Sequence, residues 1–379
     1  MTFLALRELK EQRRTHSRNH RKMFLNFSPS DIEKDSLVVF GILFFASEET
    51  VMVLENHLLT NRYIKNDSQL VSMENASIVT GFILLGMTDN PWFAVLIFGV
   101  FFIVYIITVL GNLGLVVLIG ISSRLHTPMY FFLSNLSFLD VCFSSITTPK
   151  TLANLLSQLQ EVSFLGCVTQ MSLFIIFASA ECNVLASMAY DRYTAICHPL
   201  LYHVTMSRVR CLLLVAGCYL GGLINMVAVT TSITQLSFCQ PHTLPHFFCD
   251  IPPLLALACS DPWLTQILVV GFGGFTLVTS IVVILISYLS ILMTILKIPS
   301  ASGKQKAFST CGSHLTAISL YYGTTMYTYL QPYRHGFQAG NQMVSVFYTM
   351  MIPMLNPLIY SLRNEDVKVA LWKILRNSH

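Results

Sequence analysis

Seven long apolar segments constrain this chain more than any other feature of its sequence. An α-helix rises about 1.5 Å per residue, so about 20 mostly apolar residues span the roughly 30 Å hydrocarbon core of a bilayer. The pattern predicts spanning helices near residues 94–121, 129–148, 168–190, 211–231, 264–296, 307–330 and 343–362. The segment at 307–330 is rich in Ser, Thr and Tyr and is the least apolar. The sequence therefore predicts an all-α membrane protein with a seven-transmembrane helix bundle.

Composition supports lipid as part of the solvent. Hydrophobic residues make up 54% of the chain and charged residues only 11%, whereas soluble domains carry about 25% charged residues. So few charges cannot coat a water-soluble body of 379 residues. The net charge of +4, without a basic stripe interleaved with aromatics, excludes a nucleic-acid partner.

The distribution of Lys and Arg predicts the orientation of the chain. Cytoplasmic loops of membrane proteins are enriched in these residues. The loops after the second, fourth and sixth segments hold only Lys150 and Arg334. The alternate set is basic and holds Arg124, Arg192, Arg208, Arg210, Lys297, Lys304, Lys306, Arg363, Lys368, Lys373 and Arg376. We expect the N-terminus outside and the C-terminus in the cytoplasm.

The first 72 residues differ from the rest of the chain. Residues 1–35 are polar and rich in Arg and Lys, and the apolar run at 37–45 is too short to span a bilayer. We expect residues 1–72 to be a disordered extension and residues 73–379 to form the membrane domain. Asn75 begins an N-glycosylation sequon before the first span, on the side predicted to be external.

Four of the ten cysteines lie at or near one polar segment on the predicted outer face, whereas the other six lie in apolar runs. The four are Cys167, Cys239, Cys249 and Cys259. This distribution is typical of a disulfide framework on an oxidising side of the membrane. Four cysteines allow three pairings.

Two carboxyl groups, Asp140 and Glu181, lie inside predicted spans, where ionisable groups are costly and usually functional. One interpretation is a structural hydrogen bond with one or both groups protonated. The other is a cation such as sodium, shared between the two side chains as oxygen ligands. Asn112 and Asn356 are candidates to complete this polar cluster.

Two further motifs lie in or beside predicted spans. Asp191, Arg192 and Tyr193 end the third segment, and on spacing alone an interfacial anchor is favoured over a charge switch. The seventh segment contains Pro353, Asn356, Pro357 and Tyr360; its prolines predict a kink, which a polar neighbour can turn into a hinge.

Enzyme chemistry has little support in this sequence. The motifs H-E-x-x-H and G-x-S-x-G and the P-loop are absent. The glycines at 271–274 are interpreted as a helix-packing surface. A transporter and an intramembrane hydrolase are the competing classes, but no repeated halves are visible and Ser313–His314 has no nearby acid.

Taken together, five motifs resemble those of the olfactory receptor family, of the tetrapod-type class II branch. They are LHTPMYFFL at 125–133, MAYDRYTAIC at 188–197, SY at 287–288, KAFSTCGSH at 306–314 and PMLNPLIYSLRN at 353–364. The resemblance runs from about Met73 to the C-terminus, and Asn75 and Glu181 are typical of the family. Within this resemblance we expect Cys167 to pair with Cys249 and Cys239 with Cys259. The alternative pairs Cys167 with Cys259.

The resemblance implies a G-protein-coupled receptor, and no enzyme, in the plasma membrane of olfactory sensory cilia. The implied partners are a small odorant, membrane lipid and a stimulatory, olfactory-type heterotrimeric G protein that raises cyclic AMP. Arg192 would contact the G protein and Tyr288 would stabilise the active state, while Tyr322 would form the pocket floor. The residues assigned to coupling and activation are Asp191, Arg192, Tyr193, Tyr288, Asn356, Pro357 and Tyr360.

The expected ligand site lies among the outer halves of helices 3, 5, 6 and 7. It is concave and apolar with a few orienting polar groups, as small-molecule sites usually are. Helical spacing selects Phe174, Ile175, Ala178 and Ser179 on the third helix and Tyr322, Thr325, Met326 and Tyr329 on the sixth. Thr276 lies at a similar depth in the fifth helix, and Thr349 lies on the seventh. None is charged, so we expect a neutral alcohol, aldehyde, ketone or ester. The alternative is that Phe174 and Met326 only pack between helices.

Overall fold

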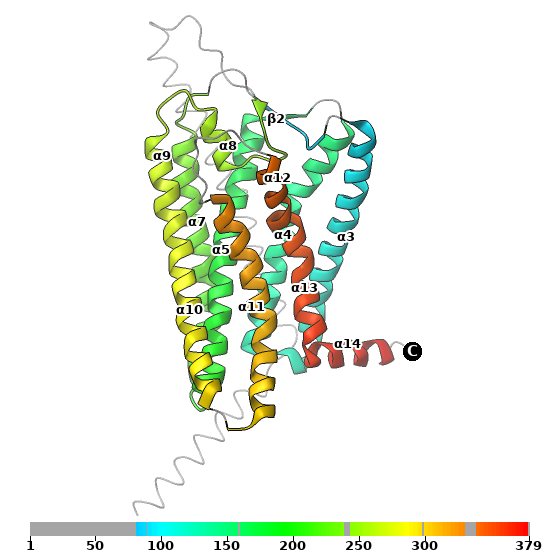
Figure 1. Cartoon of the computed structure of the whole chain (residues 1–379), viewed down its shortest axis with the longest axis vertical. Coiled ribbons are helices and arrows are strands. Elements are labelled where there is room, and N and C mark those ends of the chain that lie inside the picture. The colour runs from blue at the N-terminus through cyan, green and yellow to red at the C-terminus, as the bar shows by residue number, and fades with distance from the viewer. Residues whose placement is uncertain are drawn as a thin grey trace, which may run out of the picture.

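The computed structural model describes residues 81–377 except 89, 158–159, 239–242, 298 and 330–338. The extension 1–72, Asn75 and Cys239 lie outside the described residues. Long helices run side by side in a bundle (Figure 1). They are α3 (Pro91–Ile121), α4 (Pro128–Leu156), α5 (Phe164–Cys197), α7 (Arg208–Ile233), α9 (Trp263–Leu268) continued by η2 (Val269–Gly273) and α10 (Gly274–Lys297), α11 (Ala301–Tyr329), and α12 (Ala339–Val346) continued by η3 (Phe347–Met351) and α13 (Ile352–Arg363).

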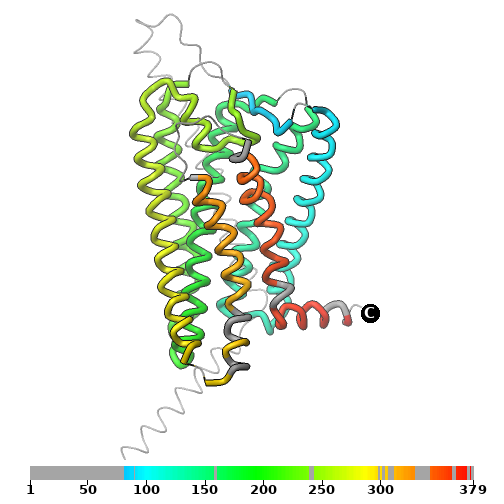
Figure 2. The backbone as a smooth tube through the Cα atoms, in the orientation of Figure 1, coloured from blue at the N-terminus to red at the C-terminus, as the bar shows by residue number. Residues whose placement is uncertain are grey.

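This architecture confirms the predicted seven-helix bundle. In the described part of the chain, six helices are long and apolar enough to cross a membrane. Helix α11 has sufficient length, at 29 residues, but its Ser, Thr and Tyr content lowers its hydropathy. Helix α14 (Glu365–Asn377) follows α13, turns steeply from it and points away from the bundle (Figure 2).

Local capping sets where several helices begin. Asn90 caps α3 by accepting a hydrogen bond from the backbone of Trp92, and Pro91 occupies the first turn. Ser163 caps α5 by accepting from the backbone N–H of Gly166. Such side chains satisfy backbone donors that have no partner inside the helix.

The glycines at 271–274 do not pack against another helix. A Cβ atom added at Gly271, Gly273 or Gly274 would meet nothing within 4 Å. The first two belong to the π-helical segment η2, so the interpretation as a helix-packing surface is wrong. A π-turn inserts a residue into the helix and changes the direction in which later side chains point.

Three short strands, which no sequence pattern predicted, lie at one end of the bundle. They are β1 (Gly81–Leu84), β2 (Glu161–Ser163) and β3 (Thr243–Leu244), in the order β2-β1-β3. Gly81 pairs with Ser163, and a Cβ atom at Gly81 would lie 2.6 Å from the carbonyl oxygen of Val162. Strand β1 therefore joins two loops that follow different helices.

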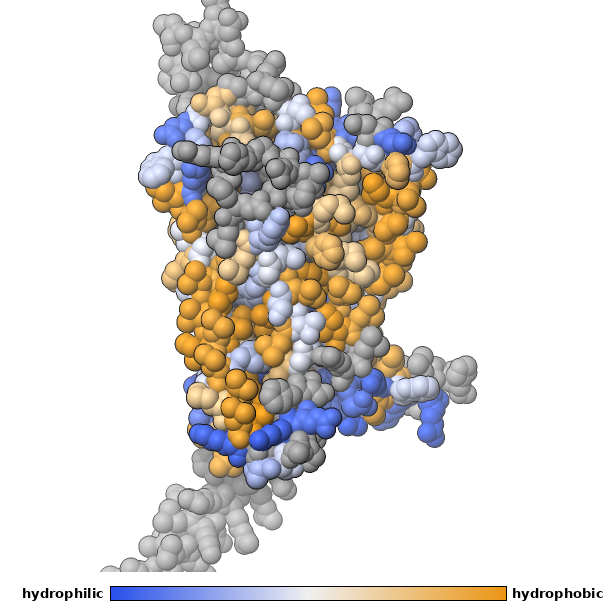
Figure 3. Space-filling model, viewed as in Figure 1, coloured by the Kyte–Doolittle hydropathy of each residue, from blue (hydrophilic) through white to orange (hydrophobic). Residues whose placement is uncertain are grey.

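The apolar surface is arranged for lipid. Helix α5 packs against α4, α7 and α10, with a core that includes Phe132, Leu136 and Leu185. By contrast, only 11% of the residues in the most apolar 18-residue stretch of α3, and of the α9–α10 helix, are buried inside the bundle. Hydrophobic side chains cover the middle of the bundle and hydrophilic ones gather at its ends (Figure 3). A bilayer core solvates such a surface, so the chain is a multi-pass membrane protein.

Candidate functional site

Two predicted ligand-site residues meet at a third residue that was not predicted from the sequence. Asn225 of α7 is 5% exposed. Its Nδ2 atom donates to Ser179 Oγ of α5 and to Thr276 Oγ1 of α10, both at 2.9 Å. The only signal in the sequence was an isolated Asn within an apolar span. The structure thus joins three helices through one polar group.

Phe174 and Ile175 pack in different surroundings. Phe174 belongs to the main core, with its ring centroid 4.9 Å from that of Phe143 and 5.6 Å from that of Phe248. Ile175 belongs to a separate apolar cluster that includes Met171 and Met226. Phe174 therefore contacts an aromatic group, whereas Ile175 belongs to the outer α5–α7 contact.

Tyrosine hydroxyls of α11 bind the backbone of α5. Tyr322 donates to the carbonyl of Cys182 at 3.0 Å, and Tyr321 donates to the carbonyl of Ala178 at 2.9 Å. The structure therefore places Tyr322 and Ala178 on neighbouring faces of two helices, and adds Tyr321, which was not selected from the sequence.

The remaining selected residues are less closely joined. The hydroxyls of Thr325 and Thr349 donate to carbonyls of their own helices, those of Tyr321 and Ser345. Met326 is 37% exposed. Tyr329 ends α11, and its side chain lies outside the described part of the structure.

The loop after α7 is tied to the bundle. A disulfide joins Cys167, in the first turn of α5, to Cys249, which confirms that pairing over Cys167–Cys259. Cys259 is also disulfide-bonded, while its expected partner Cys239 lies outside the described residues. The Gln170 side chain accepts from the backbone N–H of Cys249 at 2.9 Å.

His246 belongs to the same loop, and its side chain is buried against the bundle. It is fully buried, and its Nδ1 atom accepts from the backbone N–H of Phe248 at 3.4 Å. The ring proton is therefore on Nε2, which lies 3.2 Å from Ser345 Oγ of α12. Burial lowers the pKa of His246 to about 3, so the imidazole is neutral near pH 7.

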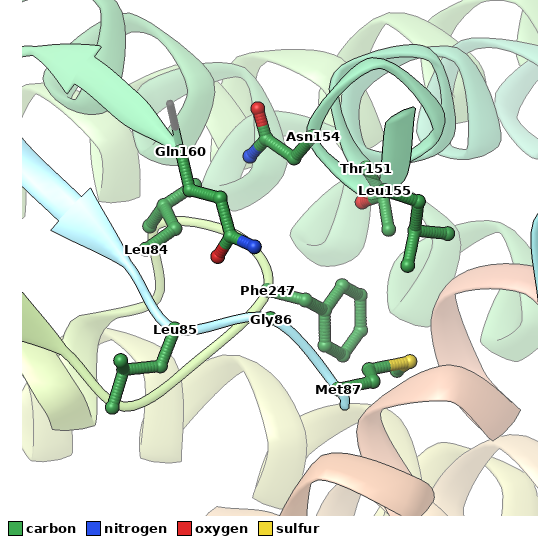
Figure 4. A pocket seen from close by; sticks show the side chains of 9 residues that line it. All are labelled: Leu84, Leu85, Gly86, Met87, Thr151, Asn154, Leu155, Gln160 and Phe247. Carbon is green, nitrogen blue, oxygen red and sulfur yellow. The ribbon is translucent and has the colours of Figure 1, made fainter. Parts of the chain in front are cut away.

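A small pocket opens beside this loop (Figure 4). It lies between the segment after β1, the end of α4 and the loop after α7. Gln160 and Phe247 contribute side chains from two loops. The other lining residues are Leu84, Leu85, Gly86, Met87, Thr151, Asn154 and Leu155. This pocket lies apart from the site selected among the third, fifth, sixth and seventh helices.

A polar cluster lies in the middle of the bundle. Asn356 Nδ2 lies 3.0 Å from each carboxylate oxygen of Asp140. Glu181 is 2% exposed and close enough to Asp140 to interact electrostatically. Asn112 instead donates to the carbonyl of Pro353 at 2.9 Å. In the described residues no group of three or more His, Cys, Asp or Glu side chains has a metal-binding arrangement.

Asn112 and Asn356 also leave oxygen atoms without partners. The Oδ1 atoms of both side chains are buried and lack a hydrogen-bond partner. They are uncharged oxygen ligands of the kind that alkali and other hard cations accept. The cluster can therefore offer carboxylate and amide oxygens to a sodium ion.

At the inner end of α5, Asp191 binds a tyrosine. Tyr202 of α6 (Tyr202–Thr205) donates to the Asp191 carboxylate at 2.8 Å. Burial, followed by the charge of Asp191, raises the pKa of Tyr202. In the described part of the chain, no ion pair within 4.0 Å joins Arg192 to Asp191. The two charges are nevertheless close enough to interact electrostatically.

Of the other activation candidates, Tyr288 and Pro357 contact neighbouring helices, whereas Tyr193 contacts the residue that ends its own helix. Tyr288 of α10 hydrogen-bonds His314 of α11 at 2.7 Å, and Tyr193 hydrogen-bonds His198 at 2.9 Å. The Tyr360 hydroxyl is buried without a hydrogen-bond partner. Pro357 lies inside α13 and faces Gly111 of α3, where an added Cβ would be 3.3 Å away.

Comparison with a solved structure defines the fold class. The fold resembles that of squid rhodopsin, with a TM-score of 0.62 and 17% identity, covering 76% of this chain and 81% of that one. At this identity the likeness concerns the fold alone, which is that of a seven-helix membrane bundle.

Sequence comparison gives the family. A model described as olfactory receptor matches residues 101–378. Olfactory receptor 5AR1 of Mus musculus is 50% identical over 302 residues, covering 80% of this chain and 97% of that protein. Olfactory receptor 5B21 of Homo sapiens is 52% identical over 303 residues, covering 80% and 98%. The chain belongs to the olfactory receptor family, whose members are signalling receptors that bind small molecules and couple to G proteins, rather than enzymes.

Proposed function

We propose that this receptor detects a small, neutral, mostly apolar odorant between the outer halves of α5, α10, α11 and the α12–α13 helix. Binding activates a stimulatory, olfactory-type G protein and raises cyclic AMP. The receptor acts in the plasma membrane of olfactory sensory cilia, with its N-terminus outside and its C-terminus in the cytoplasm.

The group formed by Ser179, Asn225 and Thr276 carries this proposal. It places hydroxyl and amide groups, without formal charge, between three helices whose neighbouring side chains are apolar. Such a group can orient one polar atom of a ligand, while the apolar surroundings contribute affinity. An amine would need a carboxylate, and none of the selected lining residues supplies one.

The test is a cyclic AMP reporter in transfected cells exposed to neutral volatile compounds and to matched amines. We expect neutral agonists only. Ala178→Phe should abolish or weaken at least tenfold the response to the larger agonists, because the ring fills space beside Tyr321. Ala216→Phe, at an exposed position of α7 away from the coupling residues, is the control for adding a ring. Unchanged potency of every agonist in Ala178→Phe, at normal surface expression, would contradict the proposed pocket.

We also propose that the cluster of Asp140, Glu181 and Asn356 holds a sodium ion. The buried carboxylates and the unpartnered amide oxygen of Asn356 support this donor set. Sodium would compensate the negative charge between the helices and favour the resting arrangement.

A further inference from the structure

The hydrogen bonds around Asn225 determine which acceptors the hydroxyl protons of Thr276 and Ser179 can reach. Thr276 Oγ1 lies 3.0 Å from the carbonyl of Phe272, one turn earlier in the same helix, and donates its proton there. Thr276 can therefore only accept from Asn225, so the amide nitrogen rather than the amide oxygen must face it.

The same amide nitrogen donates to Ser179, and this leaves the serine proton available. A hydroxyl group has one proton and two acceptor lone pairs. Among the described residues, the Ser179 hydroxyl makes one side-chain hydrogen bond, which it accepts from Asn225. The serine can then donate its proton outside this group. Ser179 is only partly buried, whereas Asn225 is 5% exposed.

From this geometry we propose that Asn225 determines ligand specificity by holding Ser179 as a hydrogen-bond donor, so that the receptor selects carbonyl-bearing odorants. A carbonyl oxygen accepts and has no proton of its own to place. This inference deepens the proposed function, on which it rests, and narrows the ligand class to aldehydes, ketones and esters. Asn225 acts through Ser179 and is a positioning residue.

A purely structural role for Asn225 makes a different prediction. Helices α5 and α7 are also joined by Ser172 and Thr230, whose hydroxyl oxygens lie 3.0 Å apart and are buried. That pair lies two turns away and is separated from Ser179. Thr230→Val therefore removes a buried polar contact between the same two helices and is the matched control.

The experiment uses pairs of odorants that differ only at the carbonyl group. In each pair a methylene group replaces the carbonyl oxygen: octanal with nonene, acetophenone with α-methylstyrene, and further aliphatic and terpenoid pairs. Cyclic AMP responses are measured for the parent receptor and for Asn225→Leu, Ser179→Ala, the double variant and Thr230→Val. Each response is normalised to surface expression.

We expect the parent to prefer the carbonyl member of a pair by roughly tenfold, the effect of about one hydrogen bond. Asn225→Leu and Ser179→Ala should each remove most of that preference. The double variant should lose no more than either single variant, because the two residues act as one unit. Thr230→Val should keep the preference. Ser179→Ala tests the idea even if Asn225→Leu fails to reach the surface.

The failures of the two proposals are distinguishable. If no compound in the panel raises cyclic AMP in the parent, the proposed function is contradicted. If agonists exist but lack a carbonyl, or if Ser179→Ala keeps the carbonyl preference, the inference about Asn225 is overturned. If Thr230→Val loses as much of the carbonyl preference as Asn225→Leu, Asn225 only contributes to the contact between helices, and the inference is likewise overturned.

Discussion

At the scale of single residues, Asp140 shows how a carboxyl group is accommodated within a membrane bundle. The amide of Asn356, on α13, faces both of its oxygens. Two elements far apart in the sequence thereby depend on one interaction. A change at Asp140 should therefore affect the position of α13, which also carries Pro357 and Tyr360.

Asp140→Asn should change basal signalling or agonist potency severalfold and leave expression largely intact. The substitution keeps the shape of the side chain but removes the charge that binds Asn356 and the proposed sodium ion. Replacing sodium with choline in the medium should alter basal cyclic AMP in the parent but not in this variant. Ser144→Ala is the control on the same helix, because its hydroxyl donates to the carbonyl of Val141. Parental signalling in both Asp140→Asn and Glu181→Gln would reduce the cluster to a structural role.

At the scale of elements, the loop after α7 is fixed to the bundle by several contacts. Cys249 is joined to α5, strand β3 pairs with β1, and Asp250 caps α8 (Ile251–Ala256). Tyr348 of η3 donates to the Asp250 carboxylate at 3.3 Å. These contacts hold His246 buried against α12. The folded loop therefore requires the neutral form of its imidazole.

Acidification should therefore destabilise this loop. Because the pKa of His246 is about 3 in the folded protein, against about 6.5 in an unfolded chain, the unfolded state binds more protons between these pH values. The contribution of neutral His246 to the free energy of unfolding is present in full above about pH 6.5. Below that pH it falls by up to roughly 1.4 kcal/mol per pH unit. The melting temperature of purified receptor should fall between about pH 7.5 and 5.5.

His246→Gln, which does not titrate, should lower stability at neutral pH and reduce this acid sensitivity. His203→Gln, at an exposed position of α6, should retain the parental pH dependence. Identical pH dependence in the parent and His246→Gln would show that His246 is not the responsible group.

At the scale of the whole molecule, we expect the membrane domain to function without the extension that precedes it. The matched part of the chain covers 97% of olfactory receptor 5AR1 of Mus musculus but 80% of this chain. Strand β1 is the central strand of the sheet that joins the loops before α5 and after α7. Its Phe82 and Leu84 are both 1% exposed.

A chain beginning at Met73 should reach the cell surface and respond to agonists with parental potency. A chain beginning at Gly86 should express poorly or lose potency, because it lacks β1 and the burial of Phe82 and Leu84, each worth about 1.5–3 kcal/mol. Surface labelling and the cyclic AMP reporter measure both outcomes. Loss of signalling in the Met73 chain would assign a role to residues 1–72.

The sequence by itself determined the elements of this receptor. Apolar length predicted the seven spanning helices, and residues such as Asn90 and Pro91 specify local helix ends. These signals succeed because hydrogen bonds within a helix and transfer into lipid depend on residues near one another in the chain. The buried carboxylates were also predicted from their place inside apolar spans, Ser179 and Tyr322 from helical spacing, and Thr276 from its depth in the fifth span.

Only the tertiary structure decided which of these residues meet. Asn225 binds partners 46 and 51 positions away, and helical periodicity does not encode such distances. The same limit explains why the three strands, the buried His246 and the separate packing of Ile175 were not predicted. The glycines at 271–274 were misinterpreted because a sequence shows small side chains but not whether another helix lies against them. Contacts between distant segments depend on how the helices pack around one another, and this arrangement gives Asn225 its place beside Ser179.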